Sequence, residues 1–161
     1  MNLCMLTKKV IAANITNLTD ARYFAARGVD FLLFDLSQVS LDKVFEIKEW
    51  VEGPRSLLLF DEETLPLLDE AVIKIDPFAI GARSDKVISE ISYMSAHIVI
   101  LDWTDANRIR MDEEEFFVLQ EELALRELSA SDGIILSGEK ENTVGLKDFE
   151  SMDRLLDLLE H

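Results

Sequence analysis

A regular alternation of short apolar runs with amphipathic segments limits what this chain can fold into more than any other feature. Residues 10–15 and 31–34 are two largely apolar runs, each typical of a strand buried on both faces. Thr16 and Asn17, after the first run, are residue types that begin helices, because their side-chain oxygens accept hydrogen bonds from the first turn. Gly28 is typical of a helix end. The pattern predicts a strand–helix–strand unit with parallel strands.

The alternation continues to the end of the chain and predicts one parallel α/β domain over residues 1–161. No stretch rich in Pro, Gly or Ser interrupts it, so no linker between domains is expected. The further expected strands are residues 55–60, 78–82, 97–101 and 133–136, and the further expected helices are residues 40–51, 64–75, 84–94 and 148–159.

Residues 104–115 are polar and predict no element. The apolar run 116–119 that follows has two interpretations: a strand with a helix after it, or the start of a helix that runs to Leu128. Leu119, Leu123 and Leu128 share a helical face, which supports the second interpretation, but periodicity does not decide so short a run. We favour a strand followed by a helix.

Two segments, one near each end of the chain, are distinctive: residues 9–21, KVIAANITNLTDA, and residues 132–148, which contain DGIILSGE (132–139) and VGLKD (144–148). Both resemble the phosphoribosylanthranilate isomerase family, the (β/α)8-barrel enzymes of tryptophan biosynthesis. The first is similar to the family's opening Lys-Ile-Cys-Gly-Ile-Thr, spacer and Asp-Ala. The second is similar to its last strand and closing segment, with Val144 in place of a proline.

The resemblance implies an abbreviated TIM-type (β/α) barrel of about seven parallel strands, since such barrels usually need about 250 residues and this chain has 161. We expect the shortening between Met94 and Ala96. Seven strands would leave edges with unpaired backbone groups, so we also expect a homodimer through an exposed strand edge, or a helix or loop that covers the gap.

The residues that the resemblance assigns to catalysis are mostly replaced. The family's general base is the cysteine of the first strand, and Ala13, which stands at that position, has no titratable atom. Asp102 matches the family's general acid. For phosphate binding, Ser137 and Gly138 match one half of the family's site, but Gln120, Glu121 and Glu122 stand where the other half has Gly-Gly.

These replacements predict a pseudoenzyme: an isomerase-like protein that has lost the family reaction and has a binding or regulatory role. The alternative is an active isomerase, or a related sugar-phosphate or carbonyl enzyme, that uses Asp102. No cofactor is expected, because His97 and His161 do not form a set of transition-metal ligands.

The net charge of −16 disfavours nucleic acid and anionic membranes as partners, because both would be repelled. Most of the acids are expected to coat the outer helices. A cation or a basic partner at the barrel mouth is the more specific hypothesis, since carboxylates that end successive strands would converge there. The candidate metal ligands are Asp35, Asp61, Asp102, Glu121 and Glu139.

Cys4 is the only cysteine, so an internal disulfide is excluded. The amino-terminal residues do not form a signal-peptide core. No apolar run approaches the ~20 residues that a membrane-spanning helix needs. We therefore expect a soluble, cytoplasmic protein.

Overall fold

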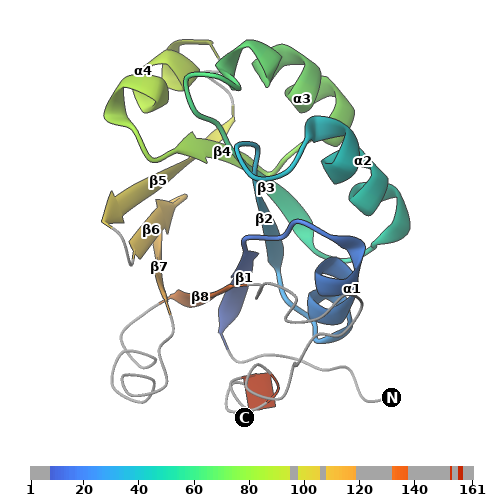
Figure 1. Cartoon of the computed structure of the whole chain (residues 1–161). Helices are drawn as coiled ribbons and strands as arrows, with labels where there is room; N and C mark the ends of the chain where they lie inside the picture. The colour runs from blue at the N-terminus through green and yellow to red at the C-terminus, as the bar shows by residue number, and fades with distance from the viewer. Residues whose placement is uncertain are drawn as a thin grey trace.

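The chain forms a closed barrel of eight strands that follow one another in sequence order (Figure 1). The structure is a computed structural model that describes residues 8–94, 98–105, 108–118, 132–137, 153 and 156–157. The strands are β1 (Lys9–Ala13), β2 (Phe31–Asp35), β3 (Arg55–Leu59), β4 (Ala79–Ala82), β5 (Val99–Asp105), β6 (Arg108–Met111), β7 (Glu114–Val118) and β8 (Gly133–Ser137). The TIM-type barrel is confirmed, with eight strands instead of about seven.

The described helices lie outside the half of the barrel that begins with β1 (Figure 1). They are α1 (Leu18–Ala26), α2 (Leu41–Trp50), the 3-10 turn η1 (Leu65–Leu67), α3 (Leu68–Ile75) and α4 (Asp85–Met94). Two predicted helix starts are confirmed. The Asn17 side chain accepts a hydrogen bond from the Asp20 N–H at 2.8 Å, and the Ser40 hydroxyl accepts one from the Lys43 N–H at 3.1 Å.

Alternate residues of each strand divide between two apolar layers. The odd-numbered residues of β1–β3 and β5 face the barrel interior, where Ile11, Leu33 and Leu57 belong to one buried cluster. The even-numbered residues of β1–β4 pack outward against the helices in a second buried cluster. The side of a strand that a residue occupies therefore decides whether it can reach a site in the barrel.

One part of the barrel departs from the parallel pattern. β6 is antiparallel to both β5 and β7, so the polar stretch 104–115 contains most of a hairpin. Its turn is made by Asp112 and Glu113, both at positive φ (51° and 68°). The predicted strand at residues 116–119 is confirmed as part of β7, whereas the helix predicted towards Leu128 lies outside the described residues.

The eighth strand removes the reason for an edge-mediated homodimer. Each strand from β1 to β8 has two hydrogen-bonded neighbours, and β8 closes on β1 with five residue pairs, from Lys9↔Gly133 to Ala13↔Ser137. The expectation of an exposed strand edge was wrong, because four alternating residues, Arg108–Met111, within a stretch that predicted no element form the additional strand β6.

Several predicted features lie outside the described residues: Gly138, Gln120, Glu121, Glu122, Glu139, the proposed shortening near residues 95–97 and nearly all of the terminal helix 148–159. Among the residues that are described, no helix is both long and apolar enough to cross a membrane.

Candidate functional site

The carboxyl ends of the parallel strands form the mouth of the barrel, the end at which TIM barrels carry their active sites. Ala13 ends β1 with its methyl group in the interior cluster, and 4% of its surface is exposed. Its neighbour in register is Ser137, the last residue of β8. The two residues therefore lie side by side at the mouth.

Asn14, directly after Ala13, has a φ of 57°. This left-handed backbone favours glycine, and asparagine is one of the few other residues that adopt it readily. Asn14 stands where the resembling family has glycine, so the backbone turn at the end of β1 provides a conformational reason for that correspondence.

A cluster of three side chains lies at the mouth: Asp35 at the end of β2, Arg83 directly after β4, and Trp103 in β5. We call these three residues the mouth cluster. Arg83 Nη1 donates to Asp35 Oδ2 at 2.7 Å, and its guanidinium lies 5.1 Å from the centre of the Trp103 ring. Ser37 donates to Asp35 Oδ1 from both its backbone N–H, at 2.9 Å, and its hydroxyl, at 2.6 Å.

Both oxygens of the Asp35 carboxylate are therefore held by hydrogen bonds. Asp35 is nearly buried, with 10% of its side chain exposed, and it accepts three hydrogen bonds. Such a carboxylate fixes the position of Arg83 and offers little to a metal ion or to a substrate proton. Arg83 itself keeps 56% of its side chain exposed, so it presents a positive charge at the mouth.

The indole of Trp103 adds an unsatisfied donor. Its Nε1 is buried and finds no acceptor in the described part of the chain. Trp103 packs against the interior cluster, together with Val99 and Leu101 of the same strand. Buried donors in native proteins are nearly always satisfied, so an N–H in this state at a barrel mouth suits a ligand that carries an acceptor oxygen.

Asp102 faces away from the barrel interior. β5 continues to Asp105 instead of ending at residues 102–103, and Asp102 pairs in register with Ala82 and Arg110. Ala82 belongs to the outer apolar layer, and Arg110 is exposed. Since neighbours on a strand point to opposite faces, the carboxylate of Asp102 lies on the outside and Trp103 occupies the interior position.

Asp61 closes a local turn. Its Oδ1 accepts from the Thr64 backbone N–H at 2.8 Å and from the Thr64 hydroxyl at 2.8 Å. The backbone hydrogen bond from Thr64, followed by the hydroxyl, holds the pKa of Asp61 below its usual value. Within the described ranges no three acidic, His or Cys side chains are grouped as metal ligands.

A cavity of about 250 Å³ opens between the ends of β2, β3 and β4. Asp35, Asp61 and Arg83 line it, along with Leu59 and Val87. The volume is just below the range of about 300–1,000 Å³ that is typical of small-molecule pockets. The site therefore fits a small ligand held at one side of the mouth.

The sequence does not reveal the partners of Arg83, because Asp35 is 48 residues away and nothing local links the two. Trp103 could be placed only once the structure showed that Leu101 faces the interior. The period of two then puts Trp103 inside and Asp102 outside.

Solved structures with the same fold include phosphoribosylanthranilate isomerases. One, in complex with reduced 1-(o-carboxyphenylamino)-1-deoxyribulose 5-phosphate, aligns with a TM-score of 0.62 at 13% identity. Monomers generated from the dimeric enzyme of Thermotoga maritima align at 0.58 and 16%, and the Pyrococcus furiosus enzyme at 0.56 and 13%. Each alignment covers 93% of this chain and 97% of the other.

No protein-family model matches the sequence, and no curated protein matches it. At 13–16% identity the structural likeness shows a common fold. What happens at the mouth has to be argued from this chain's own residues.

Proposed function

We propose that this isomerase-like barrel does not catalyse the isomerisation of phosphoribosylanthranilate and instead binds a small ligand at its mouth. The observation that carries the proposal is the pair of side chains at the two expected catalytic positions. Ala13 faces the interior without a titratable atom, and Asp102 lies on the outer face of β5.

The family reaction needs a base that takes a proton from carbon and an acid that opens the sugar ring. A positioned base alone typically contributes about 10² to 10⁴ in rate. Among the described carboxylates at the mouth, Asp35 is the candidate for this base, but its three hydrogen bonds are all with Arg83 and Ser37. Among the described residues, a bound substrate would therefore meet donors at the mouth and no free base.

The mouth cluster indicates which chemical group of a ligand would bind there. The exposed guanidinium of Arg83 and the Trp103 Nε1 are both donors, so an anionic or carbonyl oxygen is the complementary group. A cation is the competing proposal, and it depends on Glu121 and Glu139, because Asp35 and Asp61 are already engaged by Arg83 and Thr64.

Complementation of a tryptophan auxotroph that lacks the isomerase, with a fluorescence assay on purified protein, tests the loss of catalysis. We expect no growth and no turnover, and we expect Ala13→Cys not to restore either one. Growth with the unmodified chain that Asp102→Asn abolishes would overturn the proposal. That result would support the alternative, an isomerase or related sugar-phosphate or carbonyl enzyme that uses Asp102.

Thermal-shift titration tests the ligand chemistry. We expect small carboxylates or phosphate to raise the melting temperature and Arg83→Gln to remove the effect. Arg22→Gln is the matched control, because Arg22 is an exposed arginine 6.0 Å from the Trp50 ring on the outer surface. Stabilisation by divalent cations alone would favour the cation proposal.

A further inference from the structure

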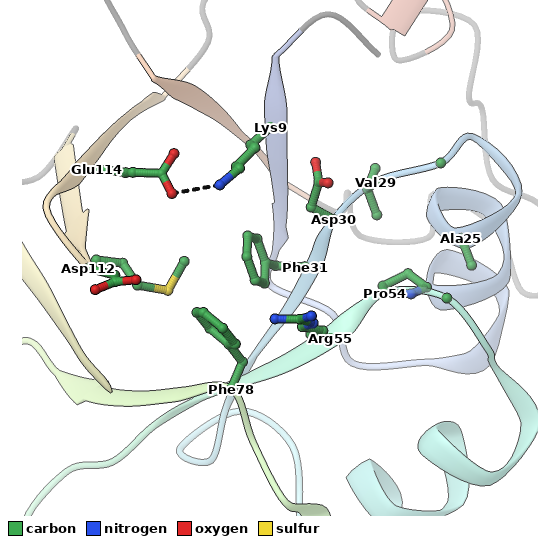
Figure 2. Close-up of a pocket in the computed structure, with 13 residues that line it drawn as sticks. Lys9, Ala25, Val29, Asp30, Phe31, Pro54, Arg55, Phe78, Asp112 and Glu114 are labelled. Atoms are coloured by element: carbon green, nitrogen blue, oxygen red, sulfur yellow. Dashed lines mark hydrogen bonds and ion pairs between the residues drawn. The ribbon is translucent and has the colours of Figure 1, made fainter. Parts of the chain in front are cut away.

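A second cavity, of about 510 Å³, opens at the amino-terminal end of the barrel, opposite the mouth (Figure 2). Residues that begin strands line it, including Lys9 of β1, Phe31 of β2 and Arg55 of β3. Because β6 is antiparallel, it brings its carboxyl end and Asp112 to the same place. The volume lies inside the range typical of small-molecule sites.

Five charged side chains line this cavity: Lys9, Asp30, Arg55, Asp112 and Glu114. Lys9 and Glu114 neutralise each other through an ion pair of 2.6 Å. Asp30 makes no ion pair within the described ranges, but its Oδ2 accepts a hydrogen bond from the Val10 N–H at 2.8 Å. Arg55 and Asp112 make no ion pair within these ranges either, and the Arg55 guanidinium lies 5.0 Å from the centre of the Phe78 ring. Among the described residues that line the cavity, Arg55 and Asp112 are therefore the charges left for a ligand.

These two charges are separated by an aromatic surface. Figure 2 shows Arg55 and Asp112 on opposite sides of the cavity, with Phe31 and Phe78 between them. The two rings pack against each other with centroids 5.3 Å apart, and Phe31 also meets Phe116 of the barrel interior. Packing against the barrel interior thus fixes this aromatic surface, so little conformational freedom is lost when a ligand binds.

Three carboxylates act on the Lys9 ammonium at this end of the barrel. The hydrogen bond with Glu114 is the main cause that raises the pKa of Lys9, and the charges of Glu114, Asp30 and Asp112 act in the same direction. A positively charged group of a ligand would be stabilised by the same carboxylates.

We infer that this cavity binds a small zwitterion whose ammonium and carboxylate groups lie at opposite ends of an apolar body, as in a dipeptide. The carboxylate pairs with Arg55, the ammonium pairs with Asp112, and the apolar part rests on Phe31 and Phe78. Planar guanidinium groups bind carboxylates through two parallel hydrogen bonds, which orients the ligand. The inference concerns the end away from the mouth and does not depend on the proposed function.

Calorimetry on the full chain with 4-(aminomethyl)benzoate tests this inference. We expect a dissociation constant in the range of about 1 mM or tighter. Replacing either charged group with methyl, in 4-methylbenzoate or 4-methylbenzylamine, should weaken binding by about tenfold or more, since each loses one ion pair. Equal binding of either analogue, or no binding of the zwitterion, would overturn the inference.

Two charge-removing variants locate the site. Arg55→Gln and Asp112→Asn should each weaken binding by about tenfold, whereas Arg22→Gln should leave it unchanged. Asn suits position 112 because it tolerates the positive φ found there. In amide spectra of the unmodified protein, the probe should shift Lys9, Phe31 and Phe78 but not Asp35 or Ser137. Shifts at the mouth, or wild-type affinity in Arg55→Gln, would contradict the assignment.

Discussion

At the scale of single residues, the end of β1 combines an unusual backbone conformation at Asn14 with a side chain, Ala13, that has no titratable group. Asn14 holds a φ of 57° directly after Ala13. We expect Asn14→Ala to lower the free energy of unfolding by about 1 kcal/mol, because an L side chain without a local hydrogen bond disfavours this conformation. Asn14→Gly should be neutral or slightly stabilising. Urea unfolding measures both variants, and equal losses would contradict the conformational explanation.

A second residue-scale prediction concerns Gly81, which pairs with Leu101 between β4 and β5. A Cβ at Gly81 would lie 2.0 Å from the Leu101 carbonyl oxygen. Because a backbone atom cannot move aside cheaply, Gly81→Ala should cost about 1–3 kcal/mol or more. The control is Gly53→Ala, where a Cβ has nothing within 4 Å and only the φ of 111° is strained. Thermal unfolding should show the larger loss at Gly81.

At the scale of elements, the turn from β3 into η1 is held by Asp61 and Thr64. Since the pKa of Asp61 is lowered on folding, its contribution to stability is present above the unfolded pKa of about 3.9 and is lost as pH falls through the folded value. We expect Asp61→Asn to keep the turn and remove this dependence below about pH 4.

Carboxyl NMR titration of the wild-type protein tests the Asp61 prediction directly. Thr64→Val removes the hydroxyl donor but keeps the backbone N–H, which is the larger cause. The pKa of Asp61 should therefore rise only part of the way towards its usual value. An Asp61 pKa in the usual range in the unmodified protein would show that the hydrogen bonds of the turn do not favour the ionised carboxylate over the protonated one.

At the scale of the whole molecule, the net charge of −16 opposes the compact state through self-repulsion. We expect the melting temperature at pH 7 to rise as NaCl screens charges over about 10 Å or less at 0.1 M and above. The increase should shrink near pH 4.4, the isoelectric point, where the net charge vanishes. An equal increase in melting temperature at both pH values would show that general salting-out, and not charge screening, causes the stabilisation.

Local sequence determined much of the first half of the barrel. The strands at residues 55–60 and 78–82 and the helix starts at Asn17 and Ser40 follow from apolar runs and capping side chains, which act over a few neighbours. The absence of a titratable group at Ala13 is also a property of the sequence alone.

Only the tertiary structure decided which side chains come into contact. The turn between β6 and β7 uses Asp112 and Glu113 at positive φ, so no glycine marks it in the sequence. The mouth joins Asp35 to Arg83 across 48 residues. The Asp102 side chain points outward because the other face of β5 points into the barrel. The packing of both faces in the tertiary structure decides this, since a run that is apolar on both faces does not show which side points inward.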